Sequence, residues 1–184
     1  MTTNAPQLTV PVSERDHIAG ALDAPLTLVE YGDYECPYCG AAHAVVKQIQ
    51  REFGRDLAFV FRNFPLVDAH PHALQAAEAA EAADAQGRFW PMHDRLFEHQ
   101  DLLDDRSLVR HAGAVGVEDL ERFTADLTEH RHLERIREDM ESGVRSGVNG
   151  TPTFFINGVR HDGAYDLETT LQALDEARSR SSRR

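Results

Sequence analysis

Two cysteines, Cys36 and Cys39, stand two residues apart in the stretch YECPYCG, and the chain has no others. This spacing suits three kinds of chemistry: a metal site, an incidental pair of thiols, or a reversible disulfide that exchanges with other molecules. Two cysteines cannot build the multiply cross-linked framework of a small secreted protein. We therefore expect any disulfide here to be reactive rather than structural.

Two elements must hold the pair in place, a strand before it and a helix after it. Residues 25–32 (PLTLVEYG) are apolar on both alternating faces, which is typical of a buried central strand. Residues 40–53 have apolar side chains at helical spacing, and Gly54 supplies a stop. The cysteines therefore fall where a strand turns into a helix.

Cys36 is predicted in the first turn of this helix, where unpaired backbone N–H groups favour a thiolate over a thiol. The thiolate is the nucleophile in disulfide exchange. We expect Cys36 to be the exposed, attacking thiol and Cys39, nearer the core, to resolve the mixed disulfide. Pro37 suits a helix start because it needs no N–H there, and the Pro37–Tyr38 dipeptide is expected to tune the stability of the thiolate.

Glu30 is a candidate proton carrier for this exchange. By the two-residue period of a strand it lies on the same side as Leu26 and Leu28. A carboxylate among buried leucines has a raised pKa. From the strand beneath the helix it can take a proton from Cys39, directly or through water. The alternative is that Glu30 lies near the strand end and is simply solvated.

The middle of the chain favours helices. A second strand is expected at 56–65, which completes a β–α–β unit around the cysteines. Beyond it the sequence is rich in alanine, the strongest helix former. The expected helices span residues 72–85, 89–99, 107–115, 118–127 and 133–144.

The two ends of the chain predict further β structure. A hairpin is expected around Asn157–Gly158, a dipeptide that favours a tight turn. Asp166 is expected to cap a closing helix that runs to about residue 178. Residues 8–12 alternate as a short edge strand does, and Pro11 suits an edge. This order of elements predicts one discontinuous α/β domain, residues 1–65 plus 146–184, with a helical insertion at 66–145.

The succession of VEYGDYECPYC, a helical block and GVNGTPTFFINGVRHDG resembles the DsbA-like branch of the thioredoxin superfamily, over about residues 8–177. The resemblance implies a thioredoxin-like α/β fold with an inserted helical domain, and a catalytic thiol–disulfide exchange activity. It implies a cis-proline loop at Thr151–Pro152 beside the cysteines, with the Thr151 backbone turned outward to pair with an extended substrate segment. Glu30 matches the buried acidic position of the family.

The same resemblance implies that no organic cofactor and no metal is needed, since the redox-active disulfide carries the electrons. Its partners would be protein thiols and disulfides and a protein that recycles the cysteines. A lowered pKa at Cys36 favours an oxidising disulfide. A reducing compartment favours a reductase or isomerase, and the sequence leaves this direction open.

Three alternatives remain. A zinc site could use the C-x2-C-x3-H cluster that ends at His43, but a structural zinc site wants four ligands, and His70 and His72 look like loop or cap residues. We expect His43 on the helix surface, facing the helical block. The CPYC tetrapeptide also resembles the glutaredoxin motif, which suggests a glutathione-linked reductase. Finally, a non-catalytic peptide-binding or sensor module can share the fold.

Charge and composition limit the kinds of binding partner that we expect. The content of 41% hydrophobic and 27% charged residues is that of an ordinary globular protein. The net charge of −12 argues against nucleic acid and anionic membranes as partners, because both repel it. The N-terminal stretch lacks a signal-peptide pattern. We therefore expect a cytoplasmic protein, and a monomer.

Overall fold

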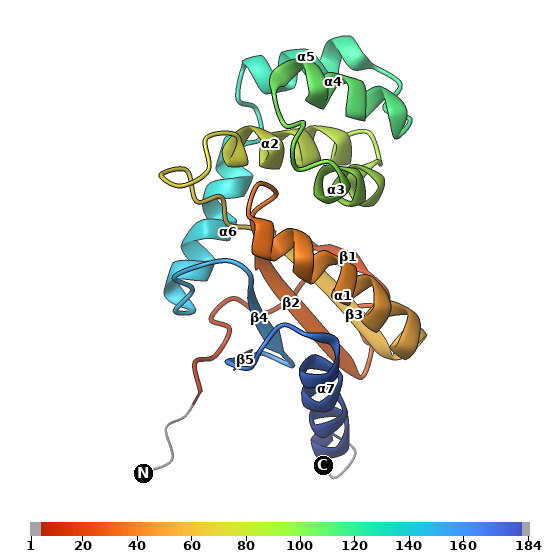
Figure 1. Cartoon of the computed structure of the whole chain (residues 1–184), viewed down its shortest axis with the longest axis vertical. Helices are drawn as coiled ribbons and strands as arrows, with labels where there is room; N and C mark the ends of the chain where they lie inside the picture. The colour runs from red at the N-terminus through yellow and green to blue at the C-terminus, as the bar shows by residue number, and fades with distance from the viewer. Residues whose placement is uncertain (1–4, 182–184) are drawn as a thin grey trace.

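A mixed sheet of five strands lies at the centre of residues 5–181, the part of the chain that this computed structural model describes (Figure 1). Its order is β1-β3-β2-β4-β5. β2 and β3 run parallel, whereas the other neighbouring strands are antiparallel. The strands are β1 (His17–Ala19), β2 (Leu26–Gly32), β3 (Leu57–Asn63), β4 (Thr153–Ile156) and β5 (Val159–His161).

Helices cover both faces of the sheet and one of its ends. Helices α1 and α7 pack on one face, α6 packs against β3, and α2 to α5 form a block beyond one end of the sheet (Figure 1). None of these helices, within residues 5–181, has both the length and the apolar character of a membrane span. The helices are α1 (Pro37–Phe53), α2 (Ala73–Asp84), α3 (Phe89–Glu98), α4 (Asp105–Ala114), α5 (Leu120–Thr128), α6 (Leu133–Arg145) and α7 (Leu167–Ser181), with a short 3-10 turn at Gly54–Asp56.

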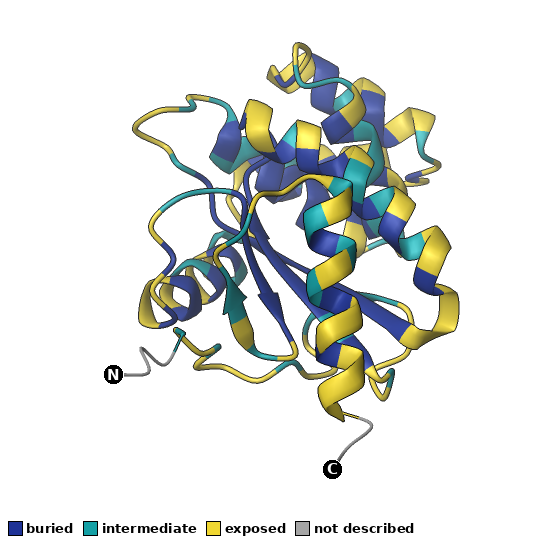
Figure 2. Ribbon diagram, turned by 60° about the horizontal axis from the view of Figure 1, so that its bottom comes forward, coloured by how far each residue is buried: buried dark blue, intermediate teal, exposed yellow. Residues whose placement is uncertain are grey.

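The central strands are buried on both faces, as the sequence predicts for residues 25–32 (Figure 2). On one face Leu26 and Leu28 join the core that includes Ile49 of α1. On the other face Val29 and Tyr31 belong to a second, smaller core on the α6 side. Glu30 points to the same face as the leucines, so the strand carries a carboxylate into the larger core.

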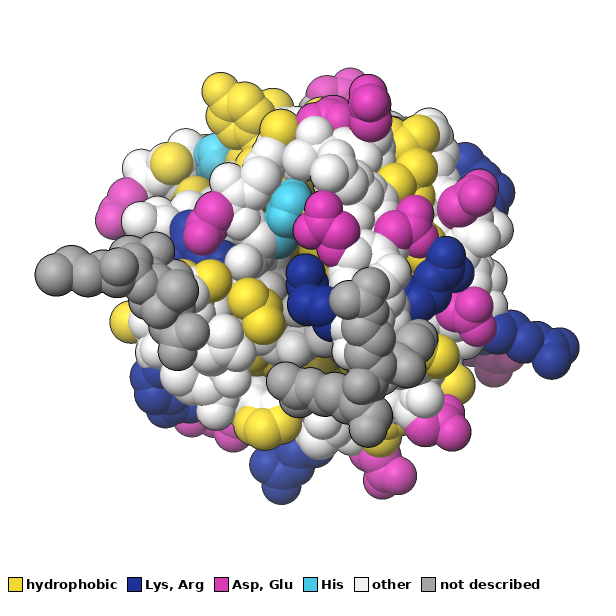
Figure 3. Space-filling model, turned by 90° about the horizontal axis from the view of Figure 1, so that it is seen from below, with side chains coloured by type: hydrophobic (Ala, Val, Ile, Leu, Met, Phe, Trp, Pro, Cys, Tyr) yellow, Lys and Arg dark blue, Asp and Glu magenta, His cyan; other side chains and the backbone are white. Residues whose placement is uncertain are grey.

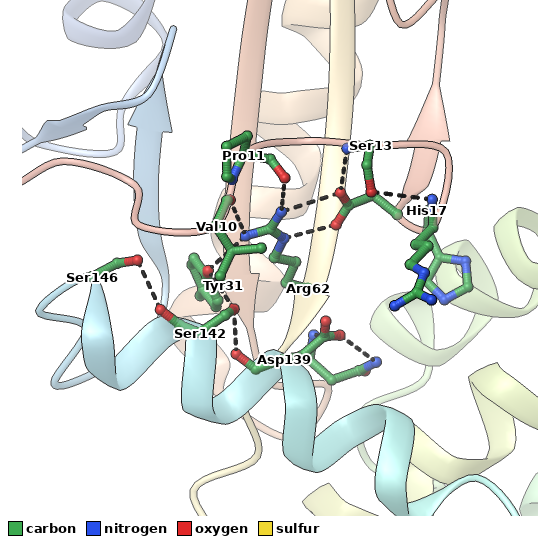
Figure 4. A network of polar contacts seen from close by, with 12 residues as sticks. Val10, Pro11, Ser13, His17, Tyr31, Arg62, Asp139, Ser142 and Ser146 are labelled. Atoms are coloured by element: carbon green, nitrogen blue, oxygen red, sulfur yellow. Dashed lines mark hydrogen bonds and ion pairs between the residues drawn. The ribbon is translucent and has the colours of Figure 1, made fainter.

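The strand expected at residues 8–12 is wrong, and Arg62 of β3 gives the reason (Figure 4). Its buried guanidinium donates to the carbonyl of Val10 at 3.0 Å and to that of Pro11 at 3.3 Å, and pairs with Asp16 at 2.7 Å. These carbonyls bind a side chain instead of a neighbouring strand. The strand at this edge is β1, which pairs antiparallel with β3 and was not predicted.

The start of this stretch and the residues before it lie along the opposite edge of the sheet. Gln7 forms an isolated bridge with Val159 of β5. The Leu8 N–H donates to the Gly158 carbonyl at 2.8 Å, and the Arg160 N–H donates to the Pro6 carbonyl at 2.9 Å. The N-terminal segment thus supplies the outer hydrogen-bond partners of β5.

The hairpin and the closing helix form where the sequence predicts them. Asn157 and Gly158 both have positive φ, 47° and 79°, as a tight primed turn requires. Asp166 accepts a hydrogen bond from the Thr169 N–H at 2.9 Å and so caps α7, which continues to Ser181.

The helices expected in the middle of the chain form close to their expected bounds, between β3 and β4. The last of them, α6, contacts β3 as well as α2. The division into residues 1–65 plus 146–184 and 66–145 stays a prediction.

The end of the molecule opposite the α2–α5 block shows acidic and basic side chains interspersed with apolar ones (Figure 3). The net charge of −12 is therefore not gathered into a single acidic field on this face.

Candidate active site

The cysteines lie at the N-terminus of α1. Cys36 is the N-cap residue, with extended backbone angles, and Pro37 is the first helical residue. Both thiols are free and both are buried: Cys36 is 3% exposed and Cys39 is fully buried. The expectation of an exposed Cys36 is therefore wrong. The outward-facing member of the motif is Tyr38, at 72% exposure.

The two thiols have opposite proton affinities. The pKa of Cys36 is lowered to about 5, mainly by a hydrogen bond from the Cys39 thiol, with further hydrogen bonds from Thr151 and from the N–H groups of Cys39 and Tyr38. The pKa of Cys39 is raised, mainly by burial, and further by its bond to Cys36 and by the charge of Glu30. At neutral pH Cys36 is a thiolate and Cys39 a thiol.

Glu30 of β2 is buried beneath these thiols. It is 1% exposed, so the alternative of a solvated carboxylate is wrong. Burial, and then the charge of Cys36, raise the pKa of Glu30 to about 8. Its Oε1 has no hydrogen-bond partner among the described residues. A Cβ at position 32 would lie 3.0 Å from that oxygen, so Gly32 leaves it room.

Thr151 and Pro152 lie against Cys36, joined by a cis peptide bond. When Cys36 is protonated, its thiol donates to the Thr151 carbonyl at 3.4 Å. The Thr151 hydroxyl is buried and lacks a hydrogen-bond partner within residues 5–181. It is therefore available to donate to the sulfur once Cys36 is ionised. The structure thus brings Cys36, Cys39, Glu30 and Thr151 together, and leaves Tyr38 facing outward.

Sequence reasoning missed Gln100, which follows α3. Its amide donates to the carbonyls of Tyr34 and Cys36, at 2.8 and 2.9 Å. A Cβ at Gly40 would come within 2.1 Å of Gln100 Oε1, so the glycine makes room for this side chain. The contact fixes the active-site turn to the inserted helices. Nothing local marks Gln100, because the partners are backbone carbonyls 64 and 66 residues away.

Sequence reasoning also missed two carboxylates that hold the active-site turn. Asp33 bonds His70 Nδ1 at 2.7 Å and also accepts from the Leu66 N–H at 2.8 Å. Glu35 bonds the His72 ring at 2.9 Å. The alternation of acidic residues before the cysteines with histidines at 70 and 72 is a signal that could have suggested this pairing.

The zinc alternative involved His43 with the two cysteines. His43 is not a surface residue, being 8% exposed, although it does face the inserted helices. Among residues 5–181, two groups of histidines and carboxylates could hold an ion, and neither contains a cysteine. The C-x2-C-x3-H cluster therefore has no geometric support.

Comparison with known proteins agrees with this fold. Residues 12–176 match a family model described as "Thioredoxin". A thioredoxin-like oxidoreductase from Silicibacter pomeroyi superposes with a TM-score of 0.79 at 27% identity, over 91% of this chain and 94% of that one. Oxidised BdbD from Bacillus subtilis superposes with a TM-score of 0.85 at 23% identity, over 95% and 97%.

Curated relatives extend the comparison to longer proteins. The chain is 47% identical over 167 residues to a protein named "Na(+)/H(+) antiporter NhaA 1" from Mycobacterium sp. (strain KMS). A protein of the same name from Salinispora arenicola is 47% identical over 171 residues. The matched region covers about 90% of this chain but only about a quarter of those relatives, 27% and 26%.

Proposed function

The chain belongs to the thioredoxin family and has the fold of its DsbA-like members, and we propose that it catalyses thiol–disulfide exchange with protein substrates. The antiporter names belong to relatives of which the chain matches about a quarter, so they do not enter this proposal. The observation that carries it is the pair of thiols at the start of α1, one with a pKa lowered to about 5 and the other raised.

The reaction begins at the Cys36 thiolate. It attacks one sulfur of a substrate disulfide, the substrate S–S bond breaks, and the other substrate sulfur leaves as a thiolate. Cys39 then gives up its proton and attacks the Cys36 sulfur. The internal disulfide forms, the second substrate sulfur leaves, and two electrons have passed to the substrate. Run backward, the same steps oxidise a substrate dithiol.

Cys39 needs a base for this second attack, because its pKa is raised. Glu30, with a pKa of about 8, can hold a proton or release it near neutral pH. We propose that Glu30 accepts the proton that Cys39 releases. Thr151 and Pro152 position the substrate backbone, and Thr151 also stabilises the Cys36 thiolate.

The test is turnover of insulin disulfides with dithiothreitol as electron donor. Cys36→Ser is expected to abolish turnover, because the attacking sulfur is gone. Cys39→Ser is expected to accumulate a covalent mixed disulfide with the substrate, visible as a band that reducing agent removes. If Cys36→Ser retains turnover, the proposal is wrong.

Two further readouts distinguish the alternatives. A glutaredoxin-like enzyme would require glutathione, whereas we expect dithiothreitol to suffice. A non-catalytic module would bind unfolded peptide equally well with and without Cys36 and show no turnover. We propose protein thiols and a protein recycling partner as the reactants, with no organic cofactor.

A further inference from the structure

Three side chains of types that can ligate metals, from two helices, meet one turn beyond Cys39. They are His43 of α1 and the neighbours His93 and Asp94 of α3, and one ligand atom from each lies within 4.8 Å of the others. Together with Lys47 they line a cavity of about 80 Å³. The cluster therefore sits at the contact between the helix that carries the cysteines and the inserted helices.

The two imidazoles are buried without full hydrogen bonding. His43 is 8% exposed and His93 is 2% exposed. Among the described residues, His43 makes no hydrogen bond, and His93 makes one, from Nδ1 to the Tyr34 hydroxyl at 3.0 Å.

The spacing between His43 and Asp94 suits two ligands of a tetrahedral cation. His43 Nε2 lies 3.6 Å from Asp94 Oδ1, beyond hydrogen-bond range. Two ligands of a tetrahedral zinc ion, at bonds of about 2.0–2.1 Å, lie roughly 3.4 Å apart. The Tyr34 hydroxyl fixes the His93 ring from its far nitrogen, as outer-shell partners of metal ligands do. Calcium and magnesium prefer oxygen ligands, so two imidazoles point to zinc.

We propose that His43, His93 and Asp94 form a zinc site that joins α1 to α3, with a solvent molecule as the fourth ligand. Lys47 opposes the binding of a cation at this site. Its ammonium lies 2.7 Å from Asp94 Oδ2, which leaves Oδ1 to face His43 but places a positive charge beside the cation.

The experiment measures zinc binding to the full chain in a Cys36→Ser/Cys39→Ser background. This background contains no thiol, so the cysteines cannot bind the metal, and the result does not depend on the proposed redox activity. Zn²⁺ is titrated against a chromophoric chelator, and bound metal is counted after dialysis. The expected result is one zinc per chain.

Four variants locate the ion. His43→Gln and Asp94→Asn are each expected to weaken zinc binding by about tenfold or more, since even outer-shell partners contribute that much. Lys47→Met is expected to tighten it by roughly tenfold, because a like charge on the same carboxylate is removed. His17→Gln, from the second buried histidine–carboxylate group, is the matched control and should leave affinity unchanged, because His17 already bonds Glu81 at 2.9 Å.

Three results would overturn the site. They are the absence of zinc binding in the background protein, equal affinity in Asp94→Asn, or a loss of binding in His17→Gln instead. Circular dichroism of each variant separates loss of a ligand from loss of the fold. The Lys47→Met variant removes only a half-exposed side chain, so it tests the proposal even if the buried substitutions unfold the protein.

Discussion

At the scale of single residues, Thr151 offers Cys36 two different partners. Its carbonyl accepts from the thiol at 3.4 Å, while its hydroxyl, buried and otherwise unpartnered, can donate only to the thiolate. Removal of the hydroxyl therefore raises the free energy of the ionised form.

Thr151→Val is expected to raise the pKa of Cys36 by about 1 unit above its value of about 5, since one hydrogen bond to the thiolate is lost. The measurement is the rate of iodoacetamide alkylation across a pH series. Thr151→Ser keeps the hydroxyl and should titrate like the wild type. Equal midpoints in the valine and serine variants would rule out this role.

Glu30→Gln is expected to stabilise the reduced protein increasingly as pH rises. The Glu30 carboxyl has a pKa of about 8 in the folded state and 4.5 as its ordinary value. Between these values the folded state binds more protons, so wild-type stability falls with rising pH, by up to about 1.4 kcal/mol per unit. The Glu30→Gln variant does not lose stability in this way. The loss of stability in the wild type is complete above pH 8.

Urea unfolding of both proteins across this range measures that difference. The matched control is Glu134→Gln, whose carboxyl is 77% exposed and should give a difference that does not vary with pH. A constant difference for Glu30→Gln as well would mean that this carboxyl titrates normally in the folded protein.

The redox residues could be found from the sequence because their signals are local. The two-residue gap between Cys36 and Cys39 identifies the pair, and the alternation of side chains along one strand places Glu30 beneath them. The burial of Cys36 and its contact with Gln100 could not be found, because both depend on segments far away along the chain.

At the scale of elements, the N-terminus of α1 is attached to the inserted helices through Gln100. This side chain occupies the space that a Cβ on Gly40 would take. The helix therefore carries a glycine where alanine would form helix better. The residue type at position 40 is set by a contact with another element, and not by helix propensity.

Gly40→Ala is expected to destabilise the protein by about 1 kcal/mol, because the new methyl group displaces Gln100 from its two hydrogen bonds. In a Gln100→Ala background the same change should stabilise it by up to about 1 kcal/mol, through helix propensity. A double-mutant cycle in urea measures this coupling. Additive effects would show that the two positions are independent.

Most elements could be predicted, because periodicity and stop signals lie within each segment. The helices of the middle block and the hairpin at Asn157–Gly158 are examples. The failures are at the sheet edge. Residues 8–12 have a strand-like pattern, yet the buried guanidinium of Arg62 takes their carbonyls, and β1 is only three residues long.

At the scale of the whole molecule, the order of segments predicted an α/β domain with inserted helices, and the resemblance of its motifs to DsbA-like proteins implied the thioredoxin-like fold. The sequence could not show how distant parts of the chain close over Cys36. The Thr151 carbonyl contacts its sulfur, and the Gln100 amide contacts its backbone carbonyl. Enclosure of this kind is a property of tertiary packing, which leaves no periodic pattern.

The reduction potential of the whole protein is expected to fall by about 30 mV per pH unit above pH 5 and by about 59 mV per unit below it. Reduction of the disulfide takes up one proton, on Cys39, while Cys36 stays ionised, and it takes up two below the Cys36 pKa of about 5. Equilibration with glutathione or dithiothreitol across a pH series gives the slope. A slope near 59 mV up to pH 8 would mean that Cys36 is protonated there.

The hydrogen bonds between residues 6–8 and β5 limit the tendency of separate copies of the chain to associate. An unpaired strand edge recruits other chains and seeds aggregates. Here the protein's own N-terminal segment already occupies that edge, through Leu8 N–H to Gly158 and Arg160 N–H to Pro6. The segment therefore protects this edge from pairing between molecules. A chain shortened past residue 8 would expose unpaired backbone groups of β5 to other molecules and would be less soluble.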